Sequence, residues 1–306
     1  MSAPPRTPPG VESGVPLERF ATVRTGGSAE YFARASSPEL LVELLAWAAA
    51  ESLAVSVVGS GSNLLIADEG VAGLVIKLDG ELATVRIEGT TVFAGAAVRL
   101  PSLAARCARE GLTGLEFGVN IPGTVGGAVR MNAGAYGGDL SSVLRYAQIA
   151  GPDGLERRDS DSLAMRYRGS ALADGEVVAA AVIDLTPDEP AAVLERIAAM
   201  RARRHEAQPQ GIKTFGSTFK NPADPRAEGR SAGLLLSQAG CNGLGVGGAR
   251  FSPKHANFIE NTGEATTADV LAVMELGRRR VLEAFGVELE PEVQTLGEVR
   301  FPWKSG

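Results

Sequence analysis

The fold of this chain is decided by one glycine-rich stretch, GVNIPGTVGGAVRMNAGAYGG, at residues 118–138. Glycine offers no side chain to a core and loses more backbone entropy on folding than other residues. A domain that keeps such a run needs a compensating contact, and backbone laid against a flat or phosphorylated ligand supplies one. The alternative is a flexible linker. However, apolar residues and Asn interleave the glycines, and the Ser-rich repeats of linkers are missing. The stretch is therefore expected to contact a ligand rather than to form a linker, and to contribute nothing to a core.

A second glycine loop, Gly59-Ser60-Gly61-Ser62-Asn63, follows a predicted strand at residues 55–58. Glycines allow positive φ angles, and consecutive N–H groups in such a turn form a nest that binds anions such as a pyrophosphate. An ordinary tight turn is the alternative. A dinucleotide-binding Rossmann fingerprint needs a third glycine three residues after Gly61, at the start of a helix. Leu64 stands there instead, which argues against that fold.

Composition places the chain among ordinary globular proteins. It has 306 residues, of which 44% are hydrophobic and 22% charged. At about 150 residues per domain this length suggests two or three domains, enough to bury a core without disulfides. The net charge of -6 argues against a nucleic-acid partner, because a phosphate backbone needs a basic face. With two cysteines and two histidines, neither a disulfide framework nor a metal site is expected.

The sequence contains no apolar run of the ~20 residues that span a bilayer, so we expect no membrane partner. Residues 1–14 are rich in Pro and Ser and lack the apolar core of a signal peptide. We therefore expect a flexible N-terminal tail and a cytoplasmic protein.

Hydrophobic spacing predicts a mixture of helices and strands. Helices are expected at 38–48, 100–110, 190–204 and 232–239 and from Thr266, and strands at 31–33, 55–58, 73–78, 85–87, 91–94, 147–150, 177–185 and 258–259. Thr266 with Asp269 resembles a capping box, and Val270, Met274, Val281 and Phe285 would form the buried stripe of that last helix. The mixture indicates an α+β protein with boundaries near residues 80 and 205.

Six short motifs, taken together and in order, resemble those of the UDP-N-acetylenolpyruvoylglucosamine reductases, the flavoenzymes of peptidoglycan precursor synthesis. They lie at residues 25–29, 59–65, 121–138, 167–170, 216–222 and 289–293. Each motif alone is weakly specific, but the set covers nearly the whole chain after its N-terminus.

The resemblance implies a two-part FAD-binding module of the vanillyl-alcohol-oxidase-like (PCMH) type, followed by an α+β substrate domain. A tail would cover residues 1–16, the two FAD-binding subdomains residues 17–80 and 81–204, and the UDP-sugar domain residues 205–289. Residues 290–306 would return near the second subdomain. Noncovalent FAD would be held by Gly59, Ser60, Gly61, Ser62, Asn63, Leu64, Pro122, Gly123, Thr124, Gly126, Gly127 and Asn132.

The implied reaction is the NADPH-dependent reduction of UDP-N-acetylglucosamine enolpyruvate to UDP-N-acetylmuramate. By motif position, Ser217 matches the proton donor, and Arg168 and Glu292 match the groups that polarise the enolpyruvyl carboxylate and stabilise the intermediate. Taken singly, these three residues would be a turn cap, a surface ion-pair partner and a solvated strand residue. Tyr167, Lys220, Asn221 and His255 would contact the substrate, although Tyr167 is expected to pack rather than react.

The chain departs from the family pattern in two places, of which the second indicates the shorter class. No lysine precedes Gln208-Pro209, and the segment after Arg168 is too short for an inserted tyrosine over the substrate diphosphate. Lys213, Lys220 and Lys254 are candidates for that contact. Another flavin oxidase or dehydrogenase of the same fold, acting on a different sugar or alcohol, remains an alternative, as does a non-catalytic nucleotide-sugar binding protein. We expect a monomer.

Overall fold

The computed structural model describes residues 7–303, which fold into two compact units. Unit 1 contains residues 30–60 and 72–204, together with the N-terminal segment that ends at Gly14. Unit 2 contains residues 15–29 and 61–71 and the segment that begins at His205. Each unit is therefore assembled from segments that lie far apart in the sequence, and each is described by itself.

The helices are α1 (Pro38–Ala50), α2 (Leu100–Arg109), α3 (Val125–Met131), α4 (Pro190–Ala207), α5 (Ala232–Gln238) and α6 (Thr267–Phe285). The longer strands are β1 (Glu12–Pro16), β2 (Ser28–Ala35), β3 (Val55–Val58), β5 (Val71–Leu78), β6 (Val85–Glu88), β7 (Thr91–Gly95), β11 (Leu144–Gly151), β12 (Gly154–Asp159) and β13 (Val177–Asp184). Shorter strands include β4 (Leu64–Ile66), β15 (Gly245–Val246), β16 (Ala249–Phe251), β17 (Ile259–Asn261) and β18 (Gln294–Leu296).

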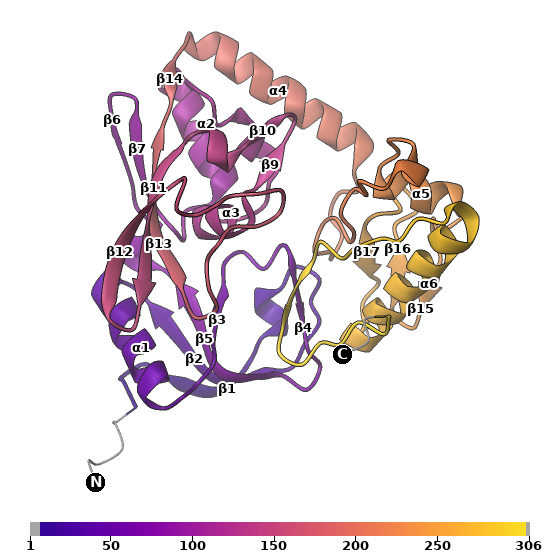
Figure 1. Ribbon diagram of the computed structural model, residues 1–306, viewed down its shortest axis with the longest axis horizontal. Helices are drawn as coiled ribbons and strands as arrows, with labels where there is room; N and C mark the ends of the chain where they lie inside the picture. Colours follow the sequence, from indigo (N-terminus) through magenta and orange to yellow (C-terminus); the bar gives the residue numbers. More distant parts are fainter. Residues whose placement is uncertain (1–6, 304–306) are drawn as a thin grey trace. The chain divides into compact units, whose positions relative to one another are not determined.

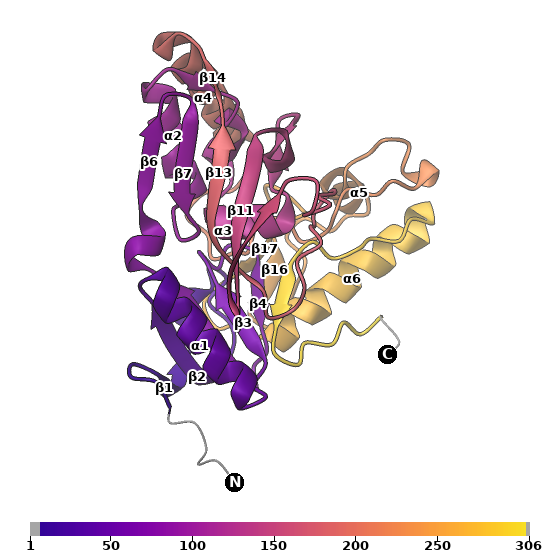
Figure 2. The same ribbon diagram turned by 60° about the vertical axis from the view of Figure 1, so that its left-hand side comes forward.

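Two sheets form the framework of unit 1. One has the order β1-β2-β5-β3, in which β3 and β5 run parallel. The other is antiparallel with the order β12-β11-β13-β7-β6, and Figure 2 shows β6, β7, β13 and β11 side by side. Helices α1, α2 and α3 contribute to one core with these strands, to which Leu44, Leu103 and Val129 belong. This core fixes the C-terminal end of β3 and the N-terminal end of α3, and one of the glycine loops lies at each of these ends.

Helix α3 lies inside the glycine-rich stretch, and it corrects part of the prediction for that stretch. Val125, Ala128 and Val129 are buried in the core, since their spacing puts all three on one face of the helix. A Cβ added to Gly126 would lie 2.9 Å from the Cβ of Ala96, so glycine lets this face approach the sheet closely. The expectation that this run contributes nothing to a core is wrong for these three apolar residues.

Unit 2 combines a small antiparallel sheet, β15-β16-β17, with α5 and α6 (Figure 1). It also pairs β4 with β18 in parallel. Helix α6 begins with the predicted capping box: Thr266 Oγ1 accepts from Asp269 N, and Thr266 N donates to the Asp269 carboxylate, both at 3.1 Å. Val270, Met274 and Val281 are buried as predicted, whereas Phe285 is half-buried.

The predicted helices and strands are present, and the mixed content confirms the α+β class. The tail differs from its prediction, because residues 12–16 form β1 at the edge of the first sheet, with Val15 buried. An edge strand tolerates the proline at its end, and the composition of the segment alone does not reveal such a strand. Residues 1–6 of the tail lie outside the described residues. Within residues 7–303, no helix combines the length and the apolarity that crossing a membrane requires.

Candidate active site

Unit 1 brings together the first residues of one glycine loop and the start of the other. Ser60 Oγ donates to the carbonyl oxygen of Pro122 at 2.6 Å. A Cβ added to Gly59 would lie only 2.7 Å from Thr124 Oγ1, so a larger residue would push the two loops apart. The structure therefore joins two segments that the sequence assigned separately to the same cofactor.

The backbone of the second glycine loop is arranged so that a cofactor could approach it closely. Its N–H groups are largely committed within the chain: Gly123 N donates to Ile121 O, and Gly127 N to the capping Thr124 Oγ1 at 3.4 Å. A Cβ added at Gly123 would meet nothing closer than Ile121 at 3.8 Å, and one at Gly127 nothing closer than Thr124 at 3.6 Å. Close packing within the chain therefore does not explain glycine at these two positions, whereas a flat ligand against the backbone would.

Lys77 contacts the first glycine loop, and the sequence analysis missed it. It lies on β5, and its Nζ donates to the carbonyl oxygen of Gly59. Burial lowers the pKa of Lys77, and the nearby charges of Arg34 and Arg99 lower it further. A lysine within the apolar strand sequence VAGLVIKL was the available signal, because lysine is rarely buried without a partner.

The rest of the first loop belongs to unit 2 and contacts the C-terminal segment there. Gly61 has a φ of 66°, and a Cβ at this position would lie 1.8 Å from the carbonyl oxygen of Phe20. Asn63 Nδ2 donates to the carbonyl oxygen of Glu292 at 3.2 Å, and Asn63 O accepts from Gln294 N at 3.0 Å. Leu64 then begins β4, beside Gln294 of β18.

Ser217 and Glu292 lie on neighbouring extended segments of unit 2. Ser217 forms a β-bridge with Phe258, and Thr218 N donates to Asn257 O at 2.8 Å. On the other side, Glu292 N donates to Thr218 O at 2.9 Å. Ser217 and Glu292 are both half-buried. A Cβ at Gly216 would lie 3.6 Å from the carbonyl oxygen of Ser62, so the glycine loop also adjoins this segment.

Arg168 lies in unit 1 at the tip of a tight turn. Arg166 and Gly169 exchange backbone hydrogen bonds of 2.9 and 3.1 Å, and Arg168 has a φ of 58° between them. Arg168 Nη1 donates to the carbonyl oxygen of Gly134 at 3.2 Å. Its guanidinium carbon lies 5.1 Å from the centre of the Tyr167 ring. Tyr167 itself is 59% exposed, so the expectation that it packs within the protein is wrong.

Several other predicted site residues have contacts that hold the fold. Asn221 Oδ1 accepts from Ala232 N at the start of α5, at 3.1 Å. Lys220 Nζ lies 3.5 Å from the Glu290 carboxylate. Asn132 ends α3 with a φ of 40°, and its Oδ1 accepts from Ser141 N at 3.0 Å. Lys254 Nζ donates to His205 O at 2.9 Å. Ligand contacts by these residues stay predictions.

His255 is half-buried next to the Ser217 segment. Its Nδ1 accepts from Asn257 N at 3.3 Å, and its ring lies 4.9 Å from that of Phe258, edge to face. Burial lowers the pKa of His255 below its usual value. These contacts describe a neutral ring that supports the loop opposite Ser217.

Cys107 and Cys241 are buried, and burial raises the pKa of the Cys107 thiol to about 11. Among residues 7–303, no group of three or more His, Cys, Asp or Glu side chains is arranged to hold a metal ion.

Comparison with known proteins gives a consistent result. The model of the UDP-N-acetylenolpyruvoylglucosamine reductase C-terminal domain matches residues 208–296, and that of an FAD binding domain matches residues 29–160. UDP-N-acetylenolpyruvoylglucosamine reductase 2 of Symbiobacterium thermophilum is 43% identical over 300 residues, covering 97% of this chain and 95% of that protein. The reductase of Acidiphilium cryptum is 44% identical over 284 residues, covering 92% of this chain and 90% of that protein.

The structural comparison agrees. The crystal structure of UDP-N-acetylenolpyruvylglucosamine reductase (MurB) from Thermus caldophilus superposes with a TM-score of 0.81 and 36% identity, covering 94% of this chain and 98% of that chain. The FAD-binding module and the family expected from the motifs are thereby confirmed. The chain belongs to the UDP-N-acetylenolpyruvoylglucosamine reductase family of FAD-dependent oxidoreductases.

Proposed function

We propose that this chain reduces UDP-N-acetylglucosamine enolpyruvate to UDP-N-acetylmuramate for peptidoglycan synthesis, with Ser217, Arg168 and Glu292 as its catalytic residues. The observation that carries the proposal is the pairing of the Ser217-Thr218 segment with Glu292, through the 2.9 Å hydrogen bond from Glu292 N to Thr218 O. It places a hydroxyl and a carboxylate from distant motifs on adjacent segments of the domain that matches the family model.

The reaction needs a redox cofactor, because no amino-acid side chain transfers hydride. Bound FAD would supply the transfer of a hydride from NADPH to the vinyl carbon of the enolpyruvyl group. The residues proposed to hold it are the two glycine loops and Asn132. The glycine backbone at Gly123 and Gly127 leaves room for a flat group, since the nearest atoms would lie 3.8 and 3.6 Å from Cβ atoms added there. Lys77 supports the first loop through the Gly59 carbonyl.

Ser217 is proposed to donate the proton to the carbon next to the ether oxygen. A serine hydroxyl is a weak acid, so it serves only a strongly basic, carbanion-like centre presented at close range. Its segment is held on both sides, by Phe258 and by the hydrogen bond that Glu292 makes to Thr218. Such a support limits the positions that the hydroxyl can adopt.

Arg168 and Glu292 are proposed to stabilise the charge that develops on the substrate. The planar guanidinium fork of Arg168 can grip the enolpyruvyl carboxylate at two points, which lysine cannot do. Its left-handed backbone conformation and its bond to Gly134 O hold the side chain at the turn. Preorganised charges of this kind stabilise a transition state without reorganising during the reaction.

Substrate contacts are proposed for Tyr167, Lys220, Asn221 and His255. Tyr167 is favoured by its exposure of 59%, since an exposed ring beside Arg168 is available to a ligand. Lys213, Lys220 and Lys254 are proposed for the substrate diphosphate in this shorter-class chain. We also propose the subdomain division at residues 17–80, 81–204 and 205–289, with residues 290–306 returning near the second subdomain, and a monomeric enzyme.

The test is NADPH oxidation by the purified protein with and without the enolpyruvyl UDP-sugar. We expect flavin to be released on denaturation, and NADPH oxidation to depend on the UDP-sugar. Oxidation that is unchanged by the UDP-sugar but stimulated by another sugar or alcohol would point to a different flavin-dependent activity. Failure to release or to bind any flavin would contradict the proposal as a whole.

A further inference from the structure

We propose that Arg130, Arg158 and Glu176 form a brace that positions Arg168, so that these three act as positioning residues for the reaction. The inference rests on the proposed role of Arg168. All four residues belong to unit 1. Arg168 lies in the segment between β12 and β13, which is outside both strands and therefore needs other contacts to be held in place.

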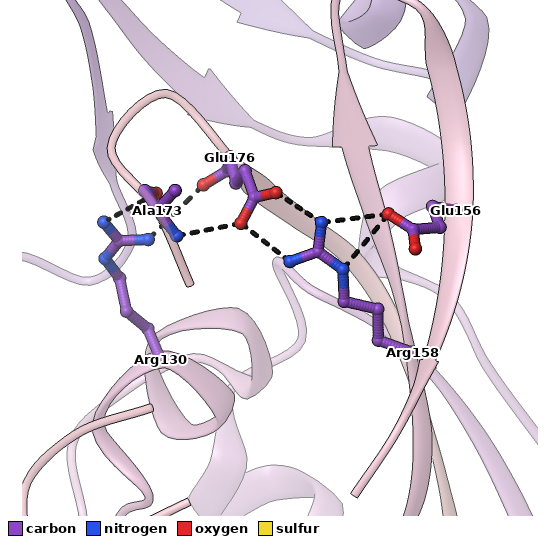
Figure 3. Close-up of polar contacts among 5 residues, drawn as sticks. All are labelled: Arg130, Glu156, Arg158, Ala173 and Glu176. Atoms are coloured by element: carbon purple, nitrogen blue, oxygen red, sulfur yellow. Dashed lines mark hydrogen bonds and ion pairs between the residues drawn. The ribbon is translucent and has the colours of Figure 1, made fainter. Parts of the chain in front are cut away.

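The first part of the brace ties the end of this segment to strand β12. Arg158 donates to both carboxylate oxygens of Glu176, including an Nη1–Oε2 bond of 2.8 Å (Figure 3). Both side chains are mostly shielded, with 23% and 22% exposed. Glu156 also accepts from Arg158, at 3.1 and 2.9 Å. Two-point Arg–carboxylate contacts fix orientation as well as distance, unlike a single exposed ion pair.

Glu176 connects this ion pair to the loop itself. Its Oε2 accepts from Ala173 N at 2.8 Å, and its own N–H donates to Ala173 O at 3.3 Å, which closes a tight turn. The hydrogen bond with Arg158 holds the pKa of Glu176 below its usual range. The carboxylate is therefore charged at neutral pH, and one side chain holds both the turn and the strand.

The second part of the brace ties the same segment to helix α3. The Arg130 guanidinium donates to Glu176 O and Ala173 O, each at 3.4 Å, as Figure 3 shows. The Arg130 carbonyl accepts from Ser170 Oγ at 2.9 Å. Ser170 lies two residues after Arg168, and Arg168 itself bonds to Gly134 O shortly after α3.

The segment that carries Arg168 is thus attached to α3 close to Arg168, at the tip of the segment. Close to Glu176, at the end of the segment, it is attached to both α3 and β12. Arg130 makes contacts at both places. Because α3 begins at the loop proposed to hold FAD, the brace fixes Arg168 relative to that loop within unit 1. Misplacement of a catalytic group by about 1 Å can lower a rate by about 100-fold. The brace therefore has a catalytic consequence without contacting the substrate.

The test uses Glu176→Gln, which keeps the side-chain shape but loses the charge that Arg158 grips. Arg157→Met is the control, because Arg157 is the neighbour of Arg158 on β12, is 57% exposed and pairs with Asp159. Flavin content, flavin reduction by NADPH and reoxidation of reduced flavin by saturating UDP-sugar are measured for each. We expect Glu176→Gln to slow reoxidation about 10-fold or more, with flavin content and reduction close to wild type. Arg157→Met should match wild type in all three.

A double-mutant cycle separates positioning from general destabilisation. Glu176→Gln is placed in an Arg168→Met background, where a brace that acts through Arg168 has nothing left to position. We expect no further loss of the reoxidation rate there. An equal further loss, or a Glu176→Gln single variant that reoxidises like wild type, overturns the brace. Should Glu176→Gln fail to fold, Arg158→Lys and Arg130→Met, measured in the same cycle, decide the question.

The two proposals fail in distinguishable ways. An Arg168→Met variant with a normal reoxidation rate contradicts the role of Arg168 in the proposed function. A slow Arg168→Met variant together with a normal Glu176→Gln variant contradicts the brace alone.

Discussion

Glu292 donates a backbone hydrogen bond of 2.9 Å to the carbonyl oxygen of Thr218, the residue that follows Ser217. Asn63 reaches the same segment by donating to the carbonyl oxygen of Glu292. Three motifs that are far apart in the sequence therefore meet within unit 2. This arrangement gives the proposed chemistry a definite set of atoms to test.

Ser217→Ala should separate the two half-reactions. NADPH meets the flavin without needing a proton from Ser217, so flavin reduction should remain close to wild type. Reoxidation by the UDP-sugar should slow by about 10²–10⁴-fold, the usual cost of a lost general acid. Anaerobic reduction by NADPH, followed by rapid mixing with saturating UDP-sugar, measures both rates. If Ser217 only shapes the turn after Gly216, alanine would lower stability or affinity, and rapid reoxidation would exclude it as the proton donor.

Arg168→Lys should impair the second half-reaction although it keeps the positive charge. Lysine lacks the planar fork that holds a carboxylate at two points. We expect reoxidation to slow by at least ~10-fold, equivalent to ~1.4 kcal/mol of transition-state stabilisation. Arg166→Lys is a matched control, since Arg166 is exposed in the same turn. A normal rate in Arg168→Lys would show that a point charge is sufficient at this position.

Much of the fold could be predicted because local signals agree with the tertiary structure. The Thr266–Asp269 capping box and the apolar spacing of Val270, Met274 and Val281 identify α6 from the sequence, and the fold buries all three apolar residues. Helix α3 was missed, because its seven residues include two glycines and its apolar spacing is short. Local propensity is weak in so short a segment, and packing against the sheet decides it.

The site could be predicted only in part, because its residues are brought together by long-range pairing. Nothing near Ser217 in the sequence indicates that Glu292 will lie beside it. The contacts of Asn221 with α5 and of His255 with Asn257 are likewise invisible in a linear motif. Lys77 was missed for a different reason, since a lysine in a strand is ordinarily solvent-exposed. Its partner, the Gly59 carbonyl, is identified only by the parallel pairing of β3 with β5.

Gly127→Ala tests whether the cofactor lies against the start of α3. The added Cβ would meet only Thr124 Oγ1, at 3.6 Å, so the flavin-free protein should fold with a thermal midpoint equal to or slightly above that of wild type. If FAD covers this backbone, the affinity of the protein for FAD should fall by about 10-fold or more, because the added methyl group would occupy the space that FAD needs to contact the backbone. Flavin fluorescence titration of the flavin-free protein measures the dissociation constant.

Gly89→Ala provides a comparison at a position outside the glycine loops. Gly89 has a φ of 59° with nothing within 4 Å of its Cβ position, so alanine there should cost stability through the backbone alone. Its FAD affinity should equal that of wild type. Unchanged FAD affinity in Gly127→Ala would show that the cofactor does not rest on this glycine.

His255 should make the protein less stable as the pH falls below neutrality. Burial holds its pKa below the usual value of 6.5, and protonation of Nδ1 would break the bond from Asn257 N. Because the folded-state pKa is the lower one, the stability that the neutral ring contributes is present above pH ~6.5. It is lost as the pH falls through the folded-state pKa, at ~1.4 kcal/mol per unit of pKa difference.

His255→Gln should flatten the dependence of the free energy of unfolding on pH between about 7.5 and 5, measured by urea denaturation. His205→Gln is the matched control, since His205 is the other of the two histidines and is exposed. Carboxylates titrate equally in all three proteins, so the difference from wild type isolates each ring. Equal slopes for wild type and His255→Gln would show that the ring is protonated as readily in the folded chain as in the unfolded one.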